Sequence, residues 1–311
     1  MKKILTPIIL FAMMTATAQR DYTQYVNPMI GTNGMGHTFP GACYPFGGVQ
    51  VSPDTDTIPH NINGKYQPGV YDYCAGYQYR DQTIVGFSHT HFSGTGHSDM
   101  GDILLMPITG EVQLNPGTAD NPDSGYRSRF SHETEKASPG YYEVRLSDDD
   151  ILVQLTATPH CGIHRYTFPQ GTPQTVVLDL DRSTYRGDAY YSGHREYYII
   201  QSQLRQVDDH TIEGYRIITG WAKLRKVYFR AEFSKPFSQH LLMNGGLNVG
   251  NSDVVNGRTL RTALTFDPKE GNELIVKVAI SPVDMEGARK NMQAEAKSWR
   301  FDDYAQAAHD V

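Results

Sequence analysis

The sequence predicts an all-β protein, a large antiparallel β-sandwich followed by a C-terminal linker helix. Between residues 141 and 280, short runs rich in β-branched and aromatic residues follow one another, separated by turn clusters such as SDDD and NGGLNVGN. The composition agrees, because 20 tyrosines, 12 phenylalanines and 29 glycines are typical of strands joined by many turns. In residues 227–233 apolar and polar residues alternate, which indicates a strand with one buried face. These patterns favour two packed antiparallel sheets.

The expected strands share this composition and fall at residues 141–146, 150–158, 162–168, 174–181, 196–207, 210–218, 226–233, 258–266 and 273–280. The segment from Asp21 to Leu114 is different, because it is richer in glycine, proline and histidine and predicts short strands joined by long irregular loops. Loops of this kind on a rigid sandwich usually carry the binding groups. We therefore expect the functional residues in this segment.

The first 18 residues have the features of a signal peptide. Lys2 and Lys3 precede an apolar run from Ile4 to Met14, and residues 16–18 give a small-x-small cleavage pattern. The run is too short to span a bilayer, and no other apolar segment approaches its length. A buried N-terminal helix is the alternative. The pattern favours an exported protein, periplasmic or secreted, with no transmembrane segment and with a β-sandwich domain from residue 19 to residue 281.

Residues 282–311 change to a helical period. Ser281 is expected to cap a helix that has Pro282 at its first position and Asp284 as the capping partner. The apolar face of this helix would consist of Met285, Ala288, Met292, Ala296 and Trp299. A second helix would place Tyr304, Ala307, Ala308 and Val311 on one side. Because this second pattern stops without a cap or a glycine, we expect a truncated helical linker; a frayed terminal helix is the alternative.

Charge and cysteine content exclude some classes of protein. The formal net charge is -6 and no basic cluster is present, so nucleic acid is not expected as a partner. Cys43, Cys74 and Cys161 are an odd number in an exported chain, so they cannot all pair internally. One bridge with one buried thiol and three buried thiols both remain open. The spacings match no zinc pattern.

Residues 86–102, GFSHTHFSGTGHSDMGD, look most like a site of chemistry. His89 and His91 would point to the same face of a strand, as in many metal hydrolases, and His97, Asp99 or Asp102 could complete the ligand set. The stretch lacks the helical H-E-x-x-H arrangement of metalloproteases. Around Ser93 it also lacks the glycine that a nucleophile elbow needs two residues earlier. A polar, hydrogen-bonded loop is therefore favoured over a metal centre or a nucleophile.

Two further segments could present groups to a ligand. Residues 31–48, GTNGMGHTFPGACYPFGG, do not match the dinucleotide fingerprint, and their glycines would let the backbone approach a ligand or a second domain. His37, Phe39 and Tyr44 would be presented there. Residues 69–81, GVYDYCAGYQYRD, carry four tyrosines. These could alternate along an ordinary strand or form an aromatic platform for a sugar ring.

Asp179 and Asp181 lie close together in VVLDLDRS. Glycoside hydrolysis needs two carboxyl groups that face each other across the scissile bond, and neighbours on one strand are poorly placed for this. We interpret the pair as structural, with Arg182 as a partner for one of the two.

Three long motifs together resemble one enzyme family. YVNPMIGTNGMGHTFPGACYPFGGVQVSPDT at residues 25–55, CAGYQYRDQTIVGFSHTHFSGTGHSDMGDILLMP at residues 74–107 and SPVDMEGARKNMQAEAKSW at residues 281–299 are similar to glycoside hydrolase family 92. This family comprises calcium-dependent, exo-acting α-mannosidases of bacteria. The resemblance covers nearly the whole chain after the signal peptide.

The resemblance implies an N-terminal β-sandwich, a helical linker and an (α/α)6 barrel that supplies the general acid, the general base and the calcium ligands for hydrolysis with inversion. This chain resembles only the sandwich and the start of the linker. We therefore expect no catalytic residue and no cofactor in it, calcium being implied for the full-length enzyme, and no hydrolysis by the chain alone. Its expected partners are a mannose-containing glycan and the missing barrel. The alternatives are a free-standing carbohydrate-binding domain and a metal-dependent hydrolase that uses His89 and His91.

In the family, loops of the sandwich help to form the substrate pocket, which implies sugar contacts from residues 36–42 and 71–77. The expected substrate-binding residues are Gly36, His37, Phe39, Tyr71, Tyr73, Cys74, His89 and His91. Tyr71 and Tyr73 stand where the family is expected to have tryptophans, which would alter stacking on the sugar; no role is assigned to His97. We also expect an exposed apolar or aromatic patch on the face of the sandwich that would meet the barrel.

Overall fold

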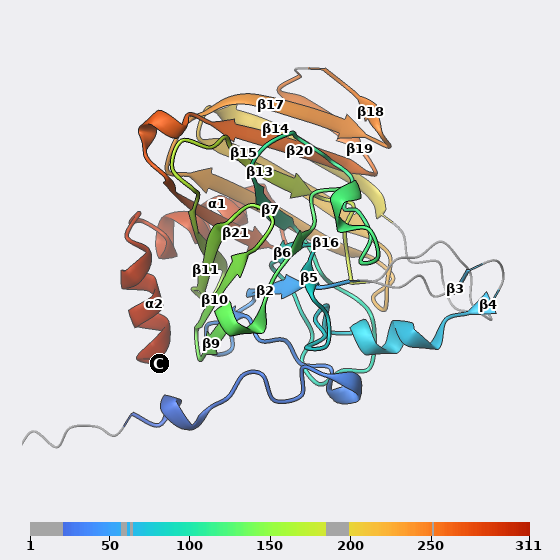
Figure 1. The fold of residues 1–311 in the computed structure, drawn as a ribbon. Coiled ribbons are helices and arrows are strands. Elements are labelled where there is room, and N and C mark those ends of the chain that lie inside the picture. Colours follow the sequence, from blue (N-terminus) through green and yellow to red (C-terminus); the bar gives the residue numbers. More distant parts are fainter. Residues whose placement is uncertain (1–20, 57–60, 63–64, 185–198, 251) are drawn as a thin grey trace, which may run out of the picture.

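The computed structural model describes residues 21–311 with the exception of residues 57–60, 63–64, 185–198 and 251. The predicted signal peptide lies outside the described residues. The described part confirms the predicted fold class, because two large antiparallel sheets pack as a sandwich and two short α-helices follow at the C-terminus (Figure 1). No helix in this part of the chain is long and apolar enough to cross a membrane.

One sheet has eight strands in the order β1-β2-β6-β7-β13-β20-β17-β18. Their bounds are β1 Ala42–Cys43, β2 Gln50–Asp54, β6 Gly86–Ser88, β7 Leu104–Ile108, β13 Gln174–Asp179, β20 Leu260–Phe266, β17 Phe237–Asn244 and β18 Leu247–Asn248. The other sheet has nine strands in the order β19-β14-β15-β16-β21-β12-β11-β10-β9. These are β19 Val254–Gly257, β14 Ile199–Asp208, β15 Thr211–Ile218, β16 Arg225–Phe233, β21 Glu273–Ser281, β12 Cys161–Thr167, β11 Ile151–Ala157, β10 Tyr141–Leu146 and β9 Lys136–Ser138.

The remaining elements are short and belong to the connections. The small strand pairs are β3 Asn61–Ile62 with β4 Lys65–Tyr66, and β5 Thr83–Ile84 with β8 Ser128–Arg129. The 3-10 helices are η1 Thr23–Tyr25, η2 Gly34–Gly36, η3 Pro68–Tyr73, η4 Pro122–Ser124, η5 His132–Thr134 and η6 Pro268–Glu270. Most of these lie in the loop-rich N-terminal part, as its composition indicated.

A strand is present in every run where the sequence predicted one, although residues 196–198 of the fifth run lie outside the described residues. After residue 114, the strands β8, β9, β17, β18 and β19 were not predicted. In β17 the polar residues of SQH interrupt the apolar run, and β19 is a four-residue edge strand of the nine-stranded sheet. Short or polar strands near a sheet edge give little periodic signal, because only part of their surface is buried.

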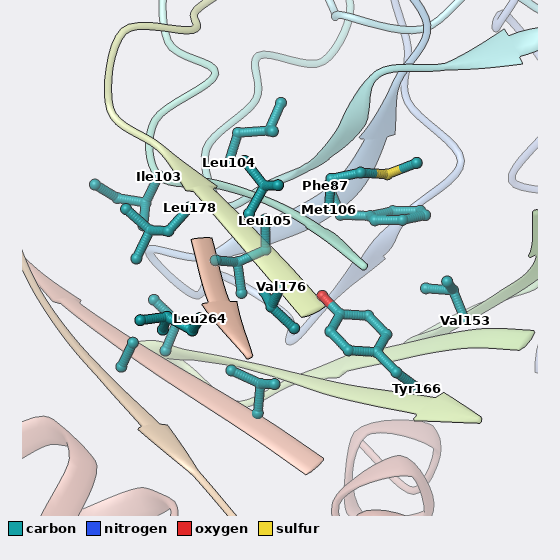
Figure 2. Packing of buried hydrophobic residues seen from close by; sticks show 14 of the residues in the cluster. Phe87, Ile103, Leu104, Leu105, Met106, Val153, Tyr166, Val176, Leu178 and Leu264 are labelled. Carbon is teal, nitrogen blue, oxygen red and sulfur yellow. The ribbon is translucent and has the colours of Figure 1, made fainter. Parts of the chain in front are cut away.

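The core fills the space between the sheets. In β16 the residues Val227, Phe229, Ala231 and Phe233 are buried, while the residues between them are partly exposed, which confirms the predicted alternation. Figure 2 shows side chains from both sheets in this layer, among them Val176 and Leu264 from the eight-stranded sheet and Val153 and Tyr166 from the nine-stranded one. Burying each such large side chain contributes about 1.5–3 kcal/mol to folding.

Helices α1 Met285–Glu295 and α2 Phe301–His309 pack on the outer face of the nine-stranded sheet. A second apolar cluster joins them to it: Cys161, Ile163, Ile275, Ala279, Met292, Ala296, Phe301 and Tyr304. The predicted cap is corrected, because the side chain of Asp284 accepts a hydrogen bond from the Gly287 N–H and begins α1 itself. The side chain of Ser281 instead accepts from the Val283 N–H, which lies before the first residue of α1, so Ser281 does not cap the helix.

The predicted apolar side of the second helix was partly wrong. Tyr304 and Ala308 are buried as expected, but Ala307 and Val311 are exposed and Phe301 takes the third buried position. The helix begins at Phe301, which the predicted apolar side did not include. Its buried stripe is therefore i, i+3, i+7 from Phe301.

The acidic pair and the cysteines are structural. Asp179 accepts from the Tyr126 hydroxyl at 2.7 Å and pairs with Arg261 at 2.8 Å, and Arg261 also pairs with Asp181. The predicted partner Arg182 donates only its backbone N–H to Asp179. Cys43, Cys74 and Cys161 are free thiols, which excludes the arrangement with one bridge; Cys74 and Cys161 are buried as the other arrangement required, but Cys43 is only partly buried.

Candidate functional site

Three loop segments distant in sequence meet at one end of the sandwich. Gln78 joins two of them, because its side chain accepts from the Gly34 N–H at 2.8 Å and donates to the Gly34 carbonyl at 3.0 Å. The same amide donates to the carbonyl of Asp72. Gln78 is buried, so this clamp fixes the loop around residue 36 against the segment that contains η3.

The loop that carries His37 depends on a close backbone approach. A Cβ atom on Gly36 would lie 2.1 Å from the Gly31 carbonyl oxygen, so only glycine fits there. His37 follows with φ of 53°, in the left-handed region, and its carbonyl accepts from the Gly94 N–H at 2.6 Å. Its Nε2 is buried and has no hydrogen-bond partner among the described residues.

The tyrosine-rich segment is not the alternating strand that was one of its two interpretations. Residues 68–73 form the 3-10 helix η3, which sends Tyr71 outward with 44% of its surface exposed and Tyr73 inward. The Tyr73 hydroxyl donates to Asp81 at 3.1 Å. Tyr77 is buried and Tyr79 stacks on His132 with ring centroids 4.0 Å apart. The four tyrosines therefore do not form one platform, and Tyr71 alone lies beside His37, at 5.8 Å between ring centroids.

Cys74 and Phe39 lie behind this pair. Cys74 is buried, its Sγ is 3.6 Å from the Ser98 hydroxyl, and burial raises the pKa of its thiol. Phe39 packs against the ring of His91 at 5.4 Å. Cys74 is thus enclosed by the loops, whereas Phe39 is only partly buried.

His89 lies deep in the sandwich and belongs to a chain of neutral groups. Its Nδ1 is 2.6 Å from the Ile103 carbonyl, and its Nε2 is 2.9 Å from Nε2 of His164, whose Nδ1 is 2.9 Å from the Tyr166 hydroxyl. One assignment of protons satisfies every atom: Tyr166 donates to His164, His164 donates to His89, and His89 donates to Ile103. Burial lowers the pKa of His89 to about 4 and that of His164 well below its usual value.

His91 turns to a different set of partners. Its Nδ1 is 2.8 Å from the Gln50 carbonyl, and its Nε2 is 3.0 Å from Asp54 and 3.1 Å from the Ser88 hydroxyl. Gly76 borders this pair, since a Cβ there would lie 2.1 Å from the Asp54 carboxylate. Because His89 and His91 bond in different directions, they do not form the shared ligand set that a metal hydrolase would need. Within the described ranges no three His, Cys, Asp or Glu side chains are grouped as metal ligands.

Asp99 and Asp102, considered above as metal ligands, are held by arginines that the sequence interpretation missed. Arg225 pairs with Asp99 at 3.0 Å and also with Asp102, and Arg216 lies 3.3 Å from Asp102. Burial alone would raise the pKa of Asp102, but Arg225 and Arg216 outweigh it and the pKa is lowered. The available signal was Arg216 at an inward-facing position of a predicted strand, since a buried arginine requires a carboxylate partner.

Comparison with known proteins agrees with this architecture. Residues 25–281 match the glycosyl hydrolase family 92 N-terminal domain. A family GH92 α-mannosidase from Bacteroides thetaiotaomicron, solved in complex with mannoimidazole, is 38% identical with a TM-score of 0.82. The match covers 94% of this chain and 36% of that one. An inverting family GH92 mannosidase from Bacteroides thetaiotaomicron VPI-5482 has the same fold, with 23% identity, a TM-score of 0.73 and the same two coverages.

A protein of Arthroderma benhamiae, described as an uncharacterized secreted glycosidase, is 29% identical over 185 residues. That match covers 57% of this chain and 22% of the fungal protein. The chain thus spans little more than a third of the solved relatives it matches. On the match over residues 25–281 and on the shared sandwich, the chain belongs to glycosyl hydrolase family 92 and corresponds to its N-terminal domain.

Proposed function

We propose that this chain is the substrate-pocket and scaffold domain of an exported α-mannosidase-like glycoside hydrolase that acts on mannose-containing glycans. The observation that carries the proposal is the pairing of an exposed Tyr71 with His37, whose Nε2 is buried and unpartnered among the described residues. An aromatic face next to an unused polar atom suits a sugar ring, which has an apolar face and hydroxyl groups. The 38% identity to an α-mannosidase supports mannose as the sugar.

In this proposal the predicted residues divide into two groups. Tyr71 stacks on the sugar, His37 bonds to one of its hydroxyls, and Gly36 permits the backbone conformation that presents His37. The remaining predicted residues hold these loops in place from below: Phe39, Tyr73, Cys74, His89 and His91. Fixing a binding group through buried neighbours lowers the entropy lost on binding.

The proton transfers of glycoside hydrolysis are assigned to another part of the enzyme. Inversion requires two carboxyl groups about 6.5–9.5 Å apart, one of them protonated. The carboxylates in and around these loops already have partners: Asp72 pairs with Arg80, Asp81 accepts from Tyr73, Asp54 pairs with His91, and Asp99 and Asp102 pair with arginines. For the same reason this donor set does not fit the calcium ion that the family implies. We infer that the barrel domain of the family supplies the acid, the base and the calcium ligands.

The test uses the purified 311-residue chain. We expect no release of mannose from α-mannosides, with or without added calcium, and weak binding of methyl α-mannoside observed by saturation-transfer NMR. The variant Tyr71→Ala should abolish this binding, whereas the matched variant Tyr79→Ala, which removes a tyrosine stacked on His132, should not. Hydrolysis by the chain alone would overturn its proposed role, and tight binding of mannose-rich glycans would favour a free-standing carbohydrate-binding domain.

A further inference from the structure

Trp221 is an exposed tryptophan to which neither the sequence interpretation nor the proposed function gives a role. It lies in the turn between β15 and β16, and 60% of its surface is exposed. One face of its indole stacks on His97, with ring centroids 4.6 Å apart and planes 20° from parallel. The edge of Phe92 approaches the indole at 6.1 Å. These are the ring contacts of Trp221 within the described residues, and they leave more than half of its surface exposed.

A network of buried charges holds this tryptophan in place. The backbone N–H of Trp221 donates to Asp99 at 3.1 Å, and Asp99 also pairs with Arg225. Arg225 is anchored in turn by the fully buried Asp102. A Cβ on Gly220 would lie 2.6 Å from the Asp99 carboxylate, so the turn fits closely over it. The backbone of this turn is therefore fixed by buried charges, and the indole itself is held by its stack on His97.

The Trp221 surface continues into the Tyr71 and His37 pair. A Cβ on Gly96 would lie 3.1 Å from the Tyr71 ring and 3.4 Å from the His37 ring. The next residue, His97, carries the stack with Trp221. Adjacent residues, Gly96 and His97, thus contact two partly exposed aromatic side chains, Tyr71 and Trp221.

We propose that Trp221, supported by His97, is a second sugar-stacking surface that binds a further residue of a mannose-containing glycan beside the one at Tyr71. This inference rests on the proposed function and adds that the ligand is an oligosaccharide. The apolar C–H face of a pyranose packs on an indole, and a ring fixed in advance loses little entropy on binding. Two adjacent surfaces would favour longer ligands over a single sugar, because the second contact is intramolecular.

Trp299 provides a matched contrast. It is the other tryptophan of the chain, it is 40% exposed, and the Lys277 ammonium lies 3.8 Å from its ring centroid. This ring therefore has a structural partner on its face. The variant Trp299→Phe leaves Trp221 as the single tryptophan, so its fluorescence reports on one site.

The experiment is a titration of the Trp299→Phe chain with methyl α-mannoside, a dimannoside and a trimannoside. We expect the Trp221 emission to shift, and its quenching by acrylamide to fall, with the oligosaccharides but not with the monosaccharide. In the otherwise native chain, Trp221→Ala should weaken oligosaccharide binding about tenfold while leaving monosaccharide binding unchanged. Trp221→Phe should restore most of the affinity, and thermal melts of both variants show whether the fold is kept.

The outcomes separate this inference from the proposed function. Suppose that mannosides bind and that Tyr71→Ala abolishes binding, but that the Trp221 emission does not change on binding and Trp221→Ala does not change the affinity. The second surface is then disproved and the proposed function stands. If no mannoside binds at millimolar concentration, both are overturned. A length-dependent gain in affinity that Trp221→Ala removes confirms the inference.

Discussion

The two tryptophans mark two regions that use aromatic rings in opposite ways. In the C-terminal region, Lys277 lies over Trp299 and Arg165 lies 4.4 Å over Phe301, so cations cover rings that attach the helices to the sheet. In the loop region, the charges are buried beneath the chain and the rings of Trp221 and Tyr71 remain open. The comparison teaches that a ring covered by a cation helps to attach the helices to the sheet, whereas the exposed rings of Trp221 and Tyr71 remain available for a ligand.

The largest expected effect comes from the buried charges under the loops. Asp102→Ala would leave Arg216 and Arg225 without their shared carboxylate, at a cost of about 3–5 kcal/mol in the free energy of unfolding. The measurement is urea unfolding, and Asp123→Ala, which removes an exposed partner of Arg129, is the control that should change nothing measurable. Equal stability of the two variants would show that the loop region does not depend on its buried charges.

A smaller effect is expected from acid, through His89. In the unfolded chain a histidine takes up a proton near pH 6.5, whereas the folded His89 does so only near pH 4. The stability due to this difference is fully present above about pH 6.5 and is lost as the pH falls toward 4, by about 3 kcal/mol. Unfolding free energies at pH 7 and pH 4.5 should therefore differ less in His89→Gln than in the native chain. An unchanged pH dependence would contradict the neutral chain from Tyr166 to Ile103.

The smallest effect is expected in the C-terminal region. Arg165→Gln removes the cation over Phe301 and an ion pair with the exposed Asp302 at 2.9 Å. Because this pair is largely buried, the cation over the ring contributes about 1–2 kcal/mol, and the free energy of unfolding should fall by that amount. Arg165→Lys keeps the charge, so its free energy of unfolding should lie between those of the native chain and of Arg165→Gln. Mannoside binding should be unaffected by either variant, which sharpens the division between the two regions.

Much of the fold could be predicted from the sequence, because it depends on local periodicity. The run at residues 141–146 coincides with β10, and the alternation in residues 227–233 is the inner and outer face of β16. Both patterns report burial on one face, which the two-residue repeat of a strand encodes directly. The strand β17 was not predicted because its polar residues interrupt this pattern.

The loop region could be located but not interpreted. A polar, hydrogen-bonded loop was favoured over a metal site for residues 86–102, but the partners could not be predicted: His89 bonds to His164 and His91 to Asp54, which lie 75 and 37 residues away. Trp221 gave no periodic signal at all, since its environment is made by His97 and Asp99 from another loop. Contacts between loops follow from the packing of the sheets that carry them.

The sequence by itself determined the sandwich, the helical C-terminal segment and, through three long motifs, the family to which the chain belongs. Only the tertiary structure decided which histidines are buried, which carboxylates are neutralised and which aromatic rings stay open. The physical reason is that burial and charge pairing depend on groups brought together across the two sheets. Periodicity along one strand carries no information about those partners.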